Sequence, residues 1–175
     1  MADEPFDPEA MLAALNGAGV RFVLIGGMAA VLHGDVGVTV DLDIAPARDP
    51  ANLERLAAAL RALDARIRTD QVPDGLPFDR SAGFLRNLGP DGILNLTTRA
   101  GALDVSFIPA GTAGYDDLKR DAVTMGAAEG VSILVASLAD VIRSKSAAGR
   151  EKDHLALPRL HALLERTSAA QRDRG

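Results

Sequence analysis

The stretch Val23-Leu-Ile-Gly-Gly-Met-Ala-Ala-Val-Leu-His-Gly34, followed shortly by Thr39-Val-Asp-Leu-Asp43, is the most informative part of this sequence of 175 residues. The apolar run at its start predicts a buried strand, and the apolar segment after the two glycines predicts the start of a helix. A strand that ends in glycines at a helix N-terminus brings main-chain N–H groups close to an anion, typically a phosphate. We therefore expect Gly26 and Gly27 to hold a phosphate group.

Two aspartates lie in the second apolar run, residues 38–44. Asp41 and Asp43 are two positions apart, and residues i and i+2 of a strand point to the same face of a sheet. Neighbouring carboxylates repel each other, so the arrangement requires a cation. A phosphate-binding turn beside a carboxylate pair predicts a nucleoside triphosphate bound through Mg²⁺, or through Mn²⁺ in its place. The alternative for this pair is a solvent-facing strand edge.

A third acid, Asp104, lies within the strand-like run 103–108. An acid in an otherwise apolar strand is costly unless it is paired or binds a metal. If its strand neighbours that of Asp41 and Asp43, three carboxylates converge and can hold two metal ions. Asp104 by itself has structural alternatives, because it could close a hairpin after Gly101 or face solvent.

Basic side chains near the C-terminus are candidates for phosphate contacts. Lys145 would act as a point charge on the β- and γ-phosphates, and Arg143 or Arg150 would add a forked contact. Asp153 would position Lys145 or take a proton. The alternative is a local charge ladder in which Asp140 pairs with Arg143, and Arg150 with Asp153, at helical i,i+3 spacing.

Composition excludes several classes of protein. The chain has no cysteine, which excludes disulfides, thiolate catalysis and cysteine-ligated zinc. The acidic N-terminal segment 1–9 is no signal peptide, and no run approaches the ~20 apolar residues of a membrane span. We expect a cytoplasmic protein with no membrane partner. Residues 143–175 carry eight Lys and Arg against four Asp and Glu, a net +4, so the remainder carries −9 of the total −5. The basic part could meet phosphate or nucleic acid, or could be an ordinary solvated helix face.

The periodicity of the apolar residues predicts an ordered series of helices and strands. Helices are predicted over 8–16, 27–33, 50–63, 115–120, 137–149 and 151–168, strands over 21–25, 38–45, 93–98, 103–108, 122–127 and 131–135, and a long loop over 69–92. This order predicts an α/β (α+β) fold, with a mixed sheet flanked by helices and a helical C-terminal part. We expect a core of residues 1–136 with the helical segment 137–175 packed on it, as one compact domain.

Taken together and in this order, the motifs resemble those of the nucleotidyltransferase superfamily, which has the fold of DNA polymerase beta. The resemblance depends on Gly26-Gly27, then Asp41-x-Asp43, then Asp104. The later Lys145, followed by Ala147-Ala-Gly-Arg-x-Lys-Asp153, is similar to the C-terminal motif of the AbiEii/MenT-type toxins. The likeness covers most of the chain, from about residue 22 to about residue 164.

The resemblance implies a metal-dependent enzyme that moves a nucleoside monophosphate from a nucleoside triphosphate to an acceptor hydroxyl and releases pyrophosphate. It implies that Asp41, Asp43 and Asp104 bind the metal, and that Asp104 also helps to deprotonate the attacking hydroxyl. It further implies that Gly26 and Gly27 hold the triphosphate.

Lys145 would neutralise that triphosphate, and Asp153 completes the catalytic set implied by the resemblance. The toxins imply a tRNA 3′ end as the acceptor and a cognate antitoxin as a partner. A protein hydroxyl or a small molecule such as an aminoglycoside is the alternative acceptor. Gly37 stands where related toxins often carry Arg, which favours another alternative, a degenerate relative that binds a nucleotide or a partner without catalysis. A purely structural protein is the third alternative.

Overall fold

The computed structural model describes residues 6–175. Its strands are β1 (Phe22–Ile25), β2 (Asp41–Pro46), β3 (Arg66–Thr69), β4 (Val72–Leu76), β5 (Ile93–Thr98), β6 (Gly101–Ser106), β7 (Val123–Ala128) and β8 (Val131–Val135). Its helices are α1 (Pro8–Gly17), α2 (Gly26–Leu32), α3 (Pro50–Ala62), α4 (Ala82–Asn87), α5 (Tyr115–Asp121), α6 (Leu138–Ala148) and α7 (Glu151–Arg172). All eight strands form one sheet in the order β4-β3-β5-β6-β2-β1-β8-β7.

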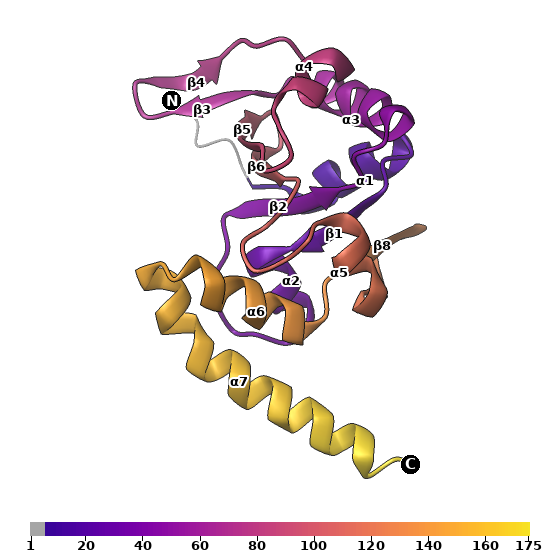
Figure 1. The fold of residues 1–175 in the computed structure, drawn as a ribbon, viewed down its shortest axis with the longest axis vertical. Helices are drawn as coiled ribbons and strands as arrows, with labels where there is room; N and C mark the ends of the chain where they lie inside the picture. The colour runs from indigo at the N-terminus through magenta and orange to yellow at the C-terminus, as the bar shows by residue number, and fades with distance from the viewer. Residues whose placement is uncertain (1–5) are drawn as a thin grey trace.

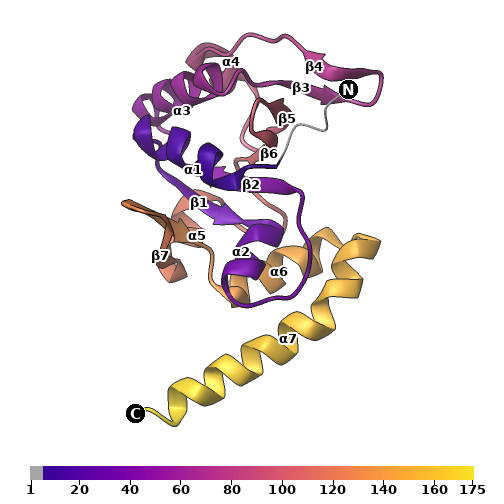
Figure 2. The same cartoon turned by 180° about the vertical axis from the view of Figure 1, so that it is seen from behind.

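The sheet is mixed, which confirms the predicted fold class. β2 is parallel to β6 and β1 is parallel to β8, whereas the other neighbouring pairs are antiparallel. In Figures 1 and 2, α1 and α3 lie across β1 and β2 from α2 and α6. The helical C-terminal part is α6 and α7, of which α6 packs against α2 and α7 packs against α6.

The central strands bury one face and leave the other partly open. In β2, Leu42 and Ile44 are fully buried and alternate with the half-buried Asp41 and Asp43. The same alternation in β6 buries Leu103 and Val105 and leaves Asp104 between them half-buried. Alternation of this kind gives each strand a core face and a second face that can carry polar groups.

The last helix extends away from the rest of the molecule. Both views show α7 leaving the body beyond α6, with the C-terminus at its far end (Figures 1 and 2). Pro158 does not interrupt this helix, and Leu163 is its last buried residue. The helix continues to Arg172, past the predicted end at residue 168. Within residues 6–175, no helix combines the length and the apolar character needed to cross a membrane.

The predicted loop over residues 69–92 is wrong, because this region contains β4 and α4 and follows β3 in a hairpin. The turn-forming residues that suggested a loop lie inside these elements. Pro73 is tolerated because β4 is an edge strand, where one side of the main chain needs no partner. Gly75 has a φ of +74°, and a Cβ atom there would lie 2.8 Å from the carbonyl oxygen of Ile67.

The second predicted strand begins later than expected. β2 starts at Asp41, whereas residues 35–40 are extended without belonging to the sheet. The cause is the length of the neighbouring strands, since β1 pairs with β2 only as far as Asp43 and β6 only as far as Asp41. An apolar, β-branched sequence can be extended there but has no partner.

A buried asparagine ties the start of β1 to the end of β2. Asn52 is fully buried on α3; its Oδ1 accepts from the Arg21 N–H (2.7 Å) and its Nδ2 donates to the carbonyls of Arg21 (2.9 Å) and Ala47 (2.7 Å). The Arg21 carbonyl also accepts from the Ala47 N–H (3.0 Å), so Asn52 is the partner that satisfies the Arg21 N–H and the Ala47 carbonyl.

We expect Asn52→Ala to lower the free energy of unfolding by about 3 kcal/mol, because it leaves the part-buried Arg21 N–H and the buried Ala47 carbonyl without partners. Urea denaturation followed by circular dichroism would measure this loss. The exposed Asn16→Ala on α1 is the matched control and should change the stability by less than about 0.5 kcal/mol. Equal effects of the two substitutions would contradict the role assigned to Asn52.

Candidate active site

The parallel pair β2 and β6 brings three acidic residues together at the centre of the sheet. In its register Asp43 stands directly opposite Asp104, and Asp41 stands opposite Ala102. The condition for three carboxylates to converge, that the strand of Asp104 neighbours that of the aspartate pair, is therefore met. All three acids are on the half-buried face of their strands, away from the apolar core.

Like charges and burial act together on the middle carboxyl group. The pKa of Asp43 is raised from 3.8 to about 7, first by burial and then by the charges of Asp41 and Asp104. Lys152 and Lys145 oppose it. A carboxyl group in this position favours either a proton or a cation.

The two glycines make room for side chains of the neighbouring strand. Gly26 has a φ of +68°, and a Cβ atom on it would lie 2.8 Å from the Cγ of Asp43. A Cβ atom on Gly27 would lie 2.9 Å from the hydroxyl oxygen of Thr39. That hydroxyl in turn donates to the carboxylate of Asp41 (3.2 Å). Close packing therefore requires glycine at both positions, against Asp43 for Gly26 and against Thr39 for Gly27. This requirement is separate from the predicted phosphate contact.

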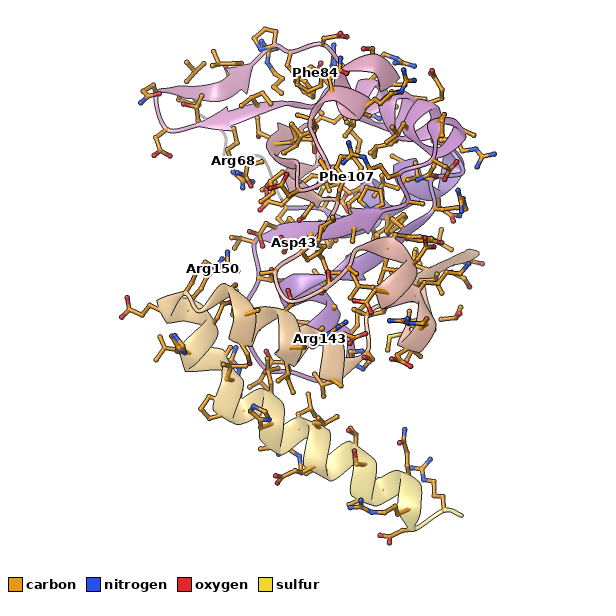
Figure 3. All side chains as sticks on the ribbon, viewed as in Figure 1. Asp43, Arg68, Phe84, Phe107, Arg143 and Arg150 are labelled. Atoms are coloured by element: carbon orange, nitrogen blue, oxygen red, sulfur yellow. The ribbon has the colours of Figure 1, made fainter. Side chains whose placement is uncertain are left out.

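Asp104 forms an ion pair with an arginine of β3. Nη2 of Arg68 lies 2.6 Å from Oδ1 of Asp104, and Nη1 donates to the carbonyl of Leu96 (3.1 Å). The pKa of Asp104 lies above its usual value, because burial and the charge of Asp41 raise it, although the Arg68 guanidinium lowers it. Figure 3 shows Arg68 and Arg150 on the same side of the molecule as Asp43.

Basic residues of α6 and α7 lie on the other side of the carboxylates. The fully buried Asp153 accepts from the Nε of Arg150 (2.8 Å) and lies 3.5 Å from the Nζ of Lys145. Although burial by itself raises the pKa of Asp153, the Arg150 guanidinium brings it below its usual value. The charges of Asp43 and Asp41 help to raise the pKa of Arg150, which places this cluster near the aspartates.

Two basic residues of the site were not among the predicted candidates, namely Lys152 and Arg68. The charge of Lys152 lowers the pKa of both Asp43 and Asp104, so its ammonium group lies near the two carboxylates. Lys152 could have been found from the sequence, because it lies in the segment 147–153 that resembles the motif of the toxins. Arg68 gave no signal, because only the order β3-β5-β6 brings it to Asp104.

Arg143 lies elsewhere, which corrects its prediction as a phosphate ligand. Its Nη2 is 2.9 Å from Oδ2 of Asp117 on α5 and 2.9 Å from Oδ1 of Asp140 on its own helix. The i,i+3 charge ladder, the alternative for these basic residues, is therefore what forms, here and between Arg150 and Asp153. Of the predicted residues, the structure brings together Gly26, Gly27, Asp41, Asp43, Asp104, Lys145, Arg150 and Asp153.

The carboxylate oxygens of Asp41, Asp43 and Asp104 are of the chemical type that binds a hard divalent cation. Their arrangement fits such a cation only in part. Among residues 6–175 no group of three or more His, Cys, Asp or Glu side chains is arranged to hold a metal ion. Arg68 occupies one oxygen of Asp104, whereas no ion pair within the described part of the chain engages Asp41 or Asp43. Carboxylate oxygens are the ligands that Mg²⁺ prefers, and the raised pKa of Asp43 reflects negative charge that a cation would balance.

A separate pocket of about 480 Å³ lies at the opposite end of β2 from Asp41. Arg21, Arg48, Phe107 and Tyr115 are among its lining residues. The guanidinium carbon of Arg48 is 4.9 Å from the centre of the Phe107 ring. Phe107 and Tyr115 are both buried, so their rings serve packing.

No model of a known protein family matches the chain, and no curated protein matches it. Its function is therefore inferred from the residues of the site and their geometry.

We expect the burial of Asp43 to make stability depend on pH. Because its pKa is 3.8 before folding and about 7 in the folded chain, the folded state binds more protons between these values, and stability falls as the pH rises through this range. Asp43→Asn removes this effect and should raise the melting temperature at pH 8 in a buffer with EDTA. The gain is at most about 4 kcal/mol, at ~1.4 kcal/mol per unit of pKa, and should vanish near pH 4.

Thermal unfolding at several pH values would measure this. The exposed Asp91→Asn is the matched control and should follow the wild-type pH dependence. A melting temperature of Asp43→Asn that is lower than that of the wild type at pH 8 would contradict the assigned crowding of charges.

Proposed function

We propose that the chain is a metal-dependent nucleotidyltransferase, which transfers a nucleoside monophosphate from a nucleoside triphosphate to an acceptor hydroxyl. The observation that carries the proposal is the register of β2 and β6, which sets Asp43 opposite Asp104 with Asp41 on the same face. The glycine turn that packs on Asp43 and the basic cluster of α6 and α7 support it. Carboxylates and cations next to each other suit a substrate that combines a divalent metal with a triphosphate.

In this proposal Asp41 and Asp43 would hold Mg²⁺, or Mn²⁺ in its place, with Asp104 as the third acid beside them, one oxygen of which pairs with Arg68. The metal supplies positive charge that neutralises the phosphate oxygens. Asp104, whose pKa is raised, takes the proton of the acceptor hydroxyl. The hydroxyl oxygen bonds to the α-phosphorus, the bond from that phosphorus to the bridging oxygen breaks, and pyrophosphate leaves.

The basic cluster would bind the triphosphate. Asp153 is fully buried and holds both Arg150 and Lys145, so the two cations are positioned before a substrate arrives. Lys152 adds a third positive charge near Asp43 and Asp104. Gly26 and Gly27 would offer main-chain N–H groups at the start of α2.

For the acceptor we propose a tRNA 3′ end, and for the biological role the toxin of a toxin–antitoxin pair with a cognate antitoxin as partner. The support is the resemblance of the motifs, together with the net +4 charge of residues 143–175. A protein or a small molecule is the alternative acceptor.

The Arg68–Asp104 ion pair favours a second candidate function, a relative that binds a nucleotide without transfer. With one oxygen of Asp104 engaged by a guanidinium, the site has two free carboxylates rather than three. Two carboxylates suffice to bind a metal–nucleotide complex. They leave the acceptor hydroxyl without a base.

We expect Asp41→Asn and Asp43→Asn each to reduce transfer by at least about 100-fold, because each removes a ligand of the cation. The assay incubates purified protein with Mg²⁺, each α-³²P-labelled nucleoside triphosphate in turn, and total RNA with protein extract, and separates the products on a denaturing gel. A labelled band of tRNA size identifies a tRNA acceptor, and a labelled protein band identifies a protein acceptor. Asp91→Asn is the control and should label as the wild type does. Undiminished labelling by Asp41→Asn would refute the assignment.

We also expect Mg²⁺ to raise the melting temperature of the wild type, since a ligand that binds only the folded state stabilises it. The increase should be absent from the double variant Asp41→Asn/Asp43→Asn. Calorimetry with a nucleoside triphosphate then separates the two candidate functions. Nucleotide binding without a labelled acceptor and without pyrophosphate release supports a binding-only relative. Nucleotide binding with a labelled acceptor and pyrophosphate release supports a nucleotidyltransferase. Absence of any Mg²⁺ or nucleotide binding would exclude both.

A further inference from the structure

The most exposed apolar side chains of the described residues gather near the start of β2. Val36, Val38 and Val40 are 89%, 94% and 70% exposed, and Leu155 on α7 is 72% exposed. The three valines alternate along residues 35–40 with half-buried positions, as on a strand with one free face. A contiguous apolar patch of this kind marks an interaction surface.

The main chain of this segment is also unpaired. Within residues 6–175, no main-chain hydrogen bond holds residues 36–40, although the segment is extended. Proteins usually protect such a strand with lysine, proline or a covering element, and residues 36–40 contain neither lysine nor proline. The segment is therefore a free template for a second extended chain.

Contacts with α7 hold the segment in place. Asp35 is nearly buried and accepts from the Nε (2.7 Å) and Nη2 (3.2 Å) of Arg159. A Cβ atom on Gly37 would lie 2.6 Å from that Nη2, so glycine leaves room for the guanidinium beneath the segment. Leu155 stands one helical turn before Arg159, which puts its exposed side chain on the side of α7 that faces this segment. The apolar face is thus presented in a fixed form.

We propose that the occupant of this face is a second copy of the chain, joined through residues 36–40 about a two-fold axis beside Val38. The sequence Val-Gly-Val-Thr-Val is self-complementary when two copies run antiparallel, because Val36 then faces Val40 and Val38 faces Val38. Such a reciprocal pattern is what a two-fold interface requires. The same register sets Asp41 opposite Asp35, whose charge Arg159 already balances, so two unbalanced carboxylates do not meet.

The area of the patch is sufficient for a weak, specific dimer. The exposures of the three valines and Leu155 correspond to about 500 Å² per copy, so a pair of copies that covers all of this area would reach the ~1,000 Å² at which specific interfaces begin. Because Val40 directly precedes Asp41, each copy would stand beside the carboxylates of the other. The interface itself requires no catalytic activity and is tested without it.

The absence of cysteine from the sequence allows a direct test by single substitutions. Residues directly opposite in an antiparallel pair have Cα atoms about 4.5–5.5 Å apart, within the range of a disulfide. Under mild oxidation Val38→Cys should form a covalent dimer. Val36→Cys and Val40→Cys should each remain largely monomeric by themselves and crosslink to each other when mixed.

Ile93→Cys, at an apolar position that is 60% exposed at the start of β5, is the matched control and should remain monomeric. Sedimentation of the wild type should show a concentration-dependent dimer that Val38→Lys abolishes. Because Val38 is 94% exposed, this substitution should leave the melting temperature unchanged at concentrations where the wild type is also monomeric. Crosslinking of Val38→Cys no faster than that of Ile93→Cys, or a wild type that stays monomeric at the highest concentration reached, would overturn the proposal.

Discussion

The crowding of three carboxylates on two neighbouring strands is the constraint on which the rest of the site depends. Asp43 and Asp104 face each other across a parallel ladder, and Asp41 lies two residues away on the same face. Aspartates there need positive charge from elsewhere, and the parts of the chain that approach this face supply it.

That positive charge comes from two distant parts of the chain. Arg68 reaches Asp104 from β3, and Lys145, Arg150 and Lys152 approach from α6 and α7. The two groups differ in kind. Arg68 pairs directly with a carboxylate, whereas Arg150 and Lys145 are held by the buried Asp153 and remain beside the aspartates without pairing to them. An anionic ligand can therefore be received without first breaking the cluster.

The segment before β2 links this site to the last helix. Asp35 binds Arg159 of α7, and Thr39 binds the carboxylate of Asp41 only two residues before the strand begins. Gly26, Gly27 and Gly37 each stand where a side chain or a guanidinium approaches the main chain closely. Glycine in this region is thus explained by steric room as well as by any bound phosphate.

The local patterns of the sequence determined the fold class, most element positions and the three aspartates, because alternation and glycine punctuation are encoded over a few residues. They failed over residues 69–92, where prolines and glycines suggested a loop and an edge hairpin formed. They also failed at Arg143. The sequence contains its acidic partners Asp117 and Asp140, but it does not show whether Arg143 pairs with them or with a phosphate. Only the tertiary structure decided that Arg68 pairs with Asp104, that α7 holds Asp35, and that three valines face outward. Each of these depends on the order of strands and the packing of a distant helix, which bring together residues that no short-range pattern relates.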